Sequence, residues 1–188
     1  MKATGHFEQV RHVDPTVVLT EQTRHHIDKW VAKFPPDRKR SALIQALFGA
    51  QEQNRGFLTD ELITAVAKYL DVPSIWAYEV ASFYSMLETR PVARNNVAIC
   101  TNISCWLNGA EDLVRHCEQK LGIKLGESTA DGRVYLKNEE ECIAACVYAP
   151  AATVNGHYHE HLTIEKLDAI LDGLSVDGPD HGHAGEAH

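Results

Sequence analysis

The stretch "CTNISCWLNG", Cys100–Gly109, holds two cysteines with four residues between them and a tryptophan directly after the second. A later stretch, "ECIAACVYAP", Glu141–Pro150, holds two more cysteines with three residues between them. Four of the five cysteines in this 188-residue chain therefore stand in two short pairs, Cys100, Cys105, Cys142 and Cys146. A buried structural cysteine needs no such neighbour, so the pairing indicates a shared metal or redox chemistry.

Four thiolates around one point bind either Zn²⁺ or an iron–sulfur cluster. Structural zinc sites most often have two residues between paired cysteines, whereas the spacing of Cys100 and Cys105 matches the opening C-x₄-C of plant-type [2Fe–2S] proteins. The spacing favours a [2Fe–2S] cluster, with a zinc-stabilised scaffolding module as the alternative. No C-x-x-C is present, which argues against a dithiol enzyme. The fifth cysteine, Cys117, falls on the apolar face of an expected helix, and we interpret it as core packing.

The first half of the chain predicts a helical domain over residues 20–90, after a lead-in over residues 1–19. Apolar residues at helical spacing predict helices over about 20–34, 39–53, 60–70 and 74–87. Thr59 is the expected N-cap of the third helix. In the fourth helix the spacing predicts a buried face of Trp76, Val80, Phe83 and Leu87.

The pattern changes after a polar break at Pro91, and residues 91–174 predict a small α/β domain. A short β-like run ends on Cys100, and an amphipathic helix follows Gly109. Two short strands flank Asn155-Gly156, a strong hairpin signal, and a last helix follows its expected cap at Thr163. The polar, histidine-rich residues 175–188 are expected to form a disordered tail. The fold class is thus α+β or α/β, with a helical bundle first.

This order of elements predicts where the four paired cysteines lie. We expect Cys100 at the end of a strand, Cys105 in the loop before a helix, and Cys142 and Cys146 in a loop between strands. Such loops can converge at one end of the sheet, which would gather the four thiols near the surface.

Composition and motifs exclude several functions. The formal net charge of −8 gives the whole chain no electrostatic footprint for nucleic acid. No apolar run approaches the roughly 20 residues that cross a bilayer, and the N-terminus has no signal-peptide core, so we expect a cytoplasmic protein without direct membrane insertion. No G-x-G-x-x-G or Walker motif is present, so we expect that the chain alone binds no NADH and has no catalytic residues or activity of its own.

Several segments together resemble the 24 kDa subunit family of NADH:quinone oxidoreductase (respiratory complex I), the thioredoxin-like [2Fe–2S] ferredoxins. The resemblance covers roughly residues 34–174. Its segments, in family order, are "EVASFYSML", "PVARNNVAICTNISCWLNGAEDL", "LGIKLGESTADGRV", "ECIAACVYAP" and "YHEHLTIEKLDAIL".

The resemblance implies a thioredoxin-like domain after the helical domain, and a [2Fe–2S] cluster on four ligands, Cys100, Cys105, Cys142 and Cys146. It implies a partner, the flavoprotein subunit that carries FMN and the NADH site, together with other peripheral-arm subunits. The complex would be peripheral to the inner membrane. Because the family also serves NAD-linked hydrogenases and formate dehydrogenases, an equivalent subunit of one of those enzymes is the alternative.

The chain departs from the family pattern at Ala144, where the family usually has glycine. A methyl group is tolerable there only if φ is negative, and the departure removes no ligand. We interpret His157, His159 and His161 as a solvated strand or turn without a functional metal. Trp106 either shields the cluster from water or anchors the following helix.

Overall fold

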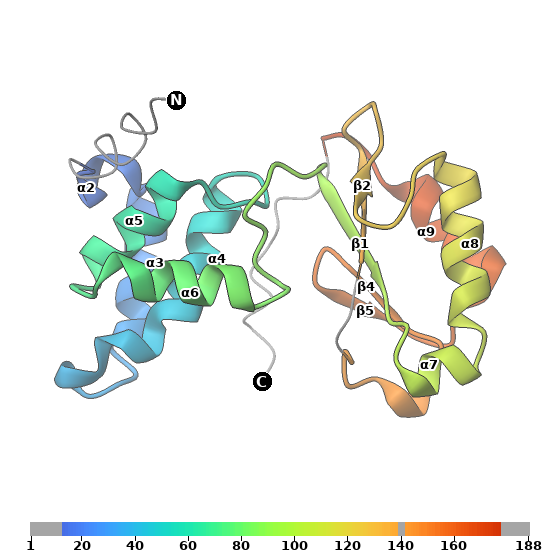
Figure 1. Cartoon of the computed structure of the whole chain (residues 1–188), viewed down its shortest axis with the longest axis horizontal. Helices are drawn as coiled ribbons and strands as arrows, with labels where there is room; N and C mark the ends of the chain where they lie inside the picture. Colours follow the sequence, from blue (N-terminus) through green and yellow to red (C-terminus); the bar gives the residue numbers. More distant parts are fainter. Residues whose placement is uncertain (1–12, 139–141, 178–188) are drawn as a thin grey trace, which may run out of the picture. The chain divides into compact units, whose positions relative to one another are not determined.

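A computed structural model of the chain describes residues 13–138 and 142–177. It divides into two compact units, Met1–Pro91 and Val92–His188 (Figure 1). None of the helices in the described ranges combines the length and the apolar character needed to cross a bilayer. Most of the expected tail lies outside the described residues, as does most of the expected lead-in.

The first unit is entirely helical in its described part. Its elements are α2 (Pro15–Val18), α3 (Glu21–Val31), the 3₁₀ helix η1 (Pro36–Ala42), α4 (Leu43–Gln53), α5 (Asp60–Tyr69) and α6 (Ser74–Phe83). Thr59 caps α5 as predicted, because its side chain accepts a hydrogen bond from the backbone N–H of Leu62. The apolar stripes meet in one core, whose fully buried side chains include Leu19, Ile27, Leu43, Leu47, Leu58, Ile63 and Leu70.

One expectation for this unit was wrong and a second was confirmed only in part. The helix predicted over 39–53 begins as the 3₁₀ helix η1, which is interrupted at Arg38 (φ −120°, ψ 28°) and becomes an α-helix only at Leu43.

The expected buried face of the fourth helix was confirmed only in part. Leu87 is buried and Val80 packs against the core, but Phe83 is 76% exposed. The fully buried residues of α6 itself are Ala77 and Ala81. Because alanine lets two helices approach closely, the alanine stripe faces the core and the larger aromatic side chains lie at its edge.

The second unit contains a mixed five-stranded sheet in the order β2-β3-β1-β4-β5, so the predicted α+β class is confirmed. Its strands are β1 (Asn95–Ile99), β2 (Glu127–Ser128), β3 (Val134–Lys137), β4 (Ala152–Val154) and β5 (His157–His159). Its helices are α7 (Ile103–Leu107), α8 (Ala110–Leu121), the 3₁₀ helix η2 (Cys146–Tyr148) and α9 (Ile164–Gly173). Figure 1 shows α8 and α9 on the same side of the sheet.

Strand β1 lies at the centre of this sheet. It pairs parallel with β3 and antiparallel with β4. Parallel strands need a crossover connection, and α8 supplies it. The sheet and the helices pack against each other in one core, which includes Val97, Ile99, Val134, Leu136, Leu113, Leu167 and Leu171. Cys117 is fully buried in this core, as its helical position predicted, and burial raises the pKa of its thiol to about 12.

The predicted hairpin between β4 and β5 is confirmed at Asn155-Gly156. Both residues have positive φ, 52° and 81°, as the tight two-residue turn requires. The side chain of Asn155 accepts from the N–H of Asn96 and donates to the buried Asn95. Asn95 in turn donates to the carbonyls of Arg133 and Ser175 at 2.7 and 2.8 Å, so it joins the start of β1 to the end of α9.

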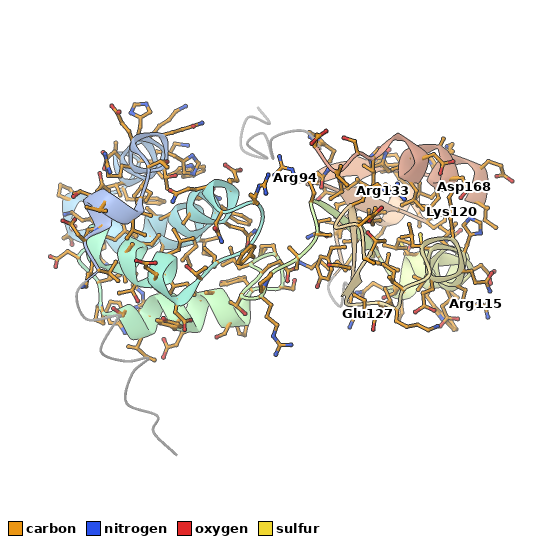
Figure 2. The ribbon with its side chains drawn as sticks, turned by 90° about the horizontal axis from the view of Figure 1, so that it is seen from above. Arg94, Arg115, Lys120, Glu127, Arg133 and Asp168 are labelled. Atoms are coloured by element: carbon orange, nitrogen blue, oxygen red, sulfur yellow. The ribbon has the colours of Figure 1, made fainter. Side chains whose placement is uncertain are left out.

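A small ionic cluster joins α8 to α9 on the outer side of the helices. Asp168 accepts from His116 Nε2 at 2.7 Å and lies 2.9 Å from Lys120 Nζ, which also contacts Asp172 at 2.8 Å. Figure 2 shows Lys120 and Asp168 close together in this unit. The hydrogen bonds from His116 and then Lys120 hold the pKa of Asp168 below its usual range.

The lowered pKa of Asp168 predicts a pH-dependent contribution to stability. Because the folded-state pKa lies below the unfolded one, this contribution is present above the ordinary aspartate pKa of about 3.9 and is lost as the pH falls through the folded value. We expect Asp168→Asn to lower the unfolding free energy at pH 7 and to flatten its decline between about pH 5 and pH 2.

Urea unfolding of the full chain across this pH range is the measurement. Asp172→Asn is the matched control, since Asp172 is 67% exposed and contacts Lys120 at the rim of the cluster. If both substitutions changed the pH dependence of the unfolding free energy equally, Asp168 would not be its specific source.

Candidate metal centre

The first cysteine pair lies at the carboxyl end of β1. Cys100 directly follows the strand, and its N–H donates to the carbonyl of Ala151 at 3.0 Å, which extends the pairing of β1 with β4 by one residue. Cys105 was expected in a loop, and this was wrong, because it lies within the short helix α7. Both side chains are buried, with exposures of 1% and 2%.

The residues at both ends of helix α7 set its limits. Asn102 has extended backbone angles at the N-cap, although its side chain makes no capping hydrogen bond, and Gly109, with φ 87°, turns the chain from α7 into α8. Glycine adopts this left-handed conformation without steric cost. The five helical residues are too few to give an apolar period, so sequence reasoning missed the helix. The signal that could have found it is the Asn102 cap with the "NG" at its end.

The second cysteine pair lies in the connection from β3 to β4, as predicted. Cys146 begins η2, and both Cys142 and Cys146 are exposed. Their sulfur atoms are 3.3 Å apart. The connection then passes through a cis peptide bond between Ala149 and Pro150 and enters β4.

The structure brings all four paired cysteines together. Burial, then a hydrogen bond with Cys100 and the nearby thiol of Cys146, raises the pKa of Cys105 to about 11. The N–H of Ala144 and the thiol of Cys146 lower the pKa of Cys142, which also contacts Cys100. The neighbouring Cys142 raises the pKa of Cys146. Each thiol therefore interacts with at least two others, so the two buried and the two exposed sulfur atoms lie near one another.

The condition under which a methyl group is tolerated at Ala144 is not met, because its φ is +62°. The methyl group stands in the left-handed region, where an L-residue is disfavoured by about 1–2 kcal/mol. This conformation turns the chain sharply between Cys142 and Cys146 and points the N–H of Ala144 at the sulfur of Cys142. The disfavoured conformation thus lies in the short loop that holds two sulfurs 3.3 Å apart.

The histidines do not join this group. His157 and His159 lie on β5, but His161 lies beyond the strand and packs edge-on against Tyr148, with ring centres 5.7 Å apart. Burial lowers the pKa of His159. In the described ranges, no three or more side chains of His, Cys, Asp or Glu have the arrangement that holds a single metal ion.

Exposed apolar side chains surround the cysteines on α7 and η2. Those on α7 are Ile103, Trp106 and Leu107, at 76%, 51% and 70% exposure, and those on η2 are Val147 and Tyr148, at 81% and 46%. We call these five residues the apolar rim. Trp106 is therefore not a buried anchor for α8. Sequence reasoning did not find the rim, because it depends on two segments about 40 residues apart being side by side.

Four convergent thiols, arranged as two pairs, fit a two-iron cluster in which each iron takes two cysteines. The chain belongs to the thioredoxin-like [2Fe–2S] ferredoxin family, whose model matches residues 27–175. The predicted family and its [2Fe–2S] cofactor are thereby confirmed.

Among its relatives are subunits of NADH-quinone oxidoreductases. The chain is 46% identical over 147 residues to the E subunit of the NADH-quinone oxidoreductase of Rickettsia bellii, covering 78% of this chain and 87% of the relative. It is 40% identical over 151 residues to a second form of the same subunit from Rhizobium meliloti, covering 80% and 88%.

A solved structure resembles the chain as well. The air-oxidized NAD⁺-reducing [NiFe]-hydrogenase aligns with a TM-score of 0.56 and 25% identity over 67% of this chain. This chain spans 22% of that hydrogenase chain.

The left-handed Ala144 predicts an unusual response to glycine. We expect Ala144→Gly to be more stable than Ala145→Gly by about 1 kcal/mol, because glycine relieves strain only at the position with positive φ. Ala145, with φ −99°, is the matched neighbour. Urea unfolding of the cluster-free full chain measures the difference, and equal stabilities would show that Ala144 carries no strain.

Proposed function

We propose that this chain is the electron-transfer subunit of an NADH-quinone oxidoreductase and that four cysteines hold its [2Fe–2S] cluster, namely Cys100, Cys105, Cys142 and Cys146. The observation that carries the proposal is the convergence of these four thiols in a chain 46% identical to a subunit of such an enzyme. When bound, a cluster of this kind accepts and releases one electron at a time.

The residues around the four cysteines stabilise negative charge on sulfur and exclude water from one side of the site. The backbone N–H groups of Ala144 and Ala151 donate to the sulfurs of Cys142 and Cys105, and each bond favours the thiolate, although burial keeps the pKa of Cys105 raised. Such hydrogen bonds stabilise negative charge on sulfur and so tune a reduction potential. The buried Cys100 and Cys105 keep one side of the site dry, whereas Cys142 and Cys146 leave the other side open to a partner.

We propose that the partner on the open side is the flavoprotein subunit with FMN and the NADH site. The sequence has no dinucleotide-binding motif, so the isolated chain is expected to be inactive. The apolar rim supports the proposal of a docked partner, because exposed apolar side chains around a redox centre allow another protein surface to pack closely. We further expect contacts with other peripheral-arm subunits and a place on the cytoplasmic side of the inner membrane.

An equivalent subunit of an NAD-linked hydrogenase is the second candidate, favoured by the structural likeness to the NAD⁺-reducing [NiFe]-hydrogenase. The higher identity to the Rickettsia bellii relative, 46% against 25%, favours the respiratory enzyme. Formate dehydrogenase and the zinc-stabilised scaffold are alternatives without a specific observation behind them.

Substitution of single cysteines tests the ligand set. We expect Cys100→Ala, Cys105→Ala, Cys142→Ala and Cys146→Ala each to abolish or strongly deplete the cluster, because each removes a thiolate donor. Iron, acid-labile sulfide and visible absorption of the purified full chain are the measurements. Cys117→Ala is the control, and it should keep a full cluster with only a modest loss of stability. Zinc in place of iron, or cluster loss confined to Cys117→Ala, would contradict the proposal.

Charge placed on the apolar rim tests the partner surface. We expect Leu107→Glu to weaken binding of the cluster-loaded chain to the flavoprotein subunit about tenfold or more, since a buried leucine side chain stabilises by about 1.5–3 kcal/mol. Val176→Glu is the control, because the half-exposed Val176 follows Ser175, which is bonded to the opposite end of β1. Pull-down titrations measure both, and equal weakening would remove the rim from the interface.

A further inference from the structure

Two backbone carbonyls join the two cysteine segments. The N–H of Cys100 donates to the carbonyl of Ala151 at 3.0 Å, at the firm end where β1 meets β4. The hydroxyl of Ser104 donates to the carbonyl of Cys146 at 2.8 Å. The second bond thus runs from the residue just before one cysteine to the backbone of another.

The two segments differ in how firmly the fold holds them. Cys100 and Cys105 are buried in the core of the second unit. Cys146 is exposed and begins a 3₁₀ helix of three residues, although Ala145 before it is buried in the same core. Exposed backbone opens locally more often than a core strand does. The exposed residues from Cys146 onward are therefore the part of the site that gains most from an additional constraint.

Ser104 is well placed to provide that constraint because α7 itself is fixed. The carbonyl of Ser104 accepts from Asn108 Nδ2 at 2.7 Å, and the N–H of Trp106 donates to Asn102 at 2.8 Å within the same helix. Ile103 and Leu107 are exposed on α7, whereas Ser104 reaches η2. The hydroxyl of Ser104 is thus held by a helix that begins beside β1.

We propose that Ser104 is a positioning residue that holds the Cys146 thiolate in place for cluster binding. The inference rests on the proposed ligand role of Cys146. The bond fixes the peptide plane that follows Cys146, and thereby the base from which its Cβ and Sγ project. Without the hydroxyl, the carbonyl of Cys146 turns toward water, the segment opens more often, and the sulfur occupies a wider range of positions.

Replacement of the hydroxyl tests this role in the cluster-loaded full chain. We expect Ser104→Ala to lose its cluster to an iron chelator about three- to tenfold faster than the unchanged chain, the factor that corresponds to one hydrogen bond. We also expect broadened or shifted lines in the electron paramagnetic resonance spectrum of the reduced cluster. A general loss of stability elsewhere in the chain would leave that spectrum unchanged.

Two further variants separate the hydroxyl from other effects. Ser104→Thr keeps the hydroxyl. Its rate of cluster loss should stay within about twofold of that of the unchanged chain, and its electron paramagnetic resonance spectrum should match that of the unchanged chain. Ser82→Ala is the matched control, because Ser82 also donates to a backbone carbonyl, that of Glu79 at 3.2 Å, but lies in the helical unit. Failure of Ser104→Ala to load any cluster, with normal loading of Ser104→Thr, would support the same role.

The proposal is wrong if Ser104→Ala matches Ser82→Ala in both chelator rate and spectrum, or if Ser104→Thr behaves like Ser104→Ala. Cys146→Ala distinguishes this failure from failure of the ligand set. If Cys146→Ala retains the cluster, the ligand assignment itself is wrong. If it loses the cluster while Ser104→Ala is unaffected, only the positioning role is overturned.

Discussion

The site depends on the antiparallel pairing of β1 with β4. In its register Ile99 lies opposite Ala152, and the N–H of Cys100 donates to Ala151 one residue further along. This pairing brings the chain that precedes β4 alongside the chain that follows β1. Cys146 lies only six residues before Ala152, so the second cysteine pair must come close to the first. A shift of the register by one residue would reverse the faces of β4 and separate the two segments.

Local chemistry in the sequence was sufficient for much of the fold. Thr59 and Thr163 were recognised as caps because a hydroxyl before an amphipathic run has one favoured role, and both accept the expected N–H. Asn155-Gly156 was recognised because few dipeptides adopt two positive φ values in succession. The four cysteines of the candidate site were found for a similar reason, since their close spacing is itself the signal. Their ligand roles remain a prediction.

The features that were missed depend on packing rather than on local pattern. Two stripes in α6 have helical spacing, and only contact with the other helices selects the alanines over Trp76 and Phe83. The positive φ of Ala144 belongs to the loop that brings the sulfurs of Cys142 and Cys146 together, and no propensity of alanine indicates it. The contact of Ser104 with Cys146 joins residues 42 positions apart and depends on α7, which is too short to show a period.

The side chain of Asn95 also sets a limit on how far the protein can be shortened. Asn95 is completely buried and needs the carbonyl of Ser175 as one of its acceptors. A chain that ends before Ser175 would leave one N–H of the buried Asn95 side chain without its acceptor, at a cost of about 1–3 kcal/mol. The hairpin turn would be affected too, because Asn155 donates to the same side chain. A functional chain that is shortened at its C-terminus, in an evolved relative or in the laboratory, should therefore extend at least through residue 175.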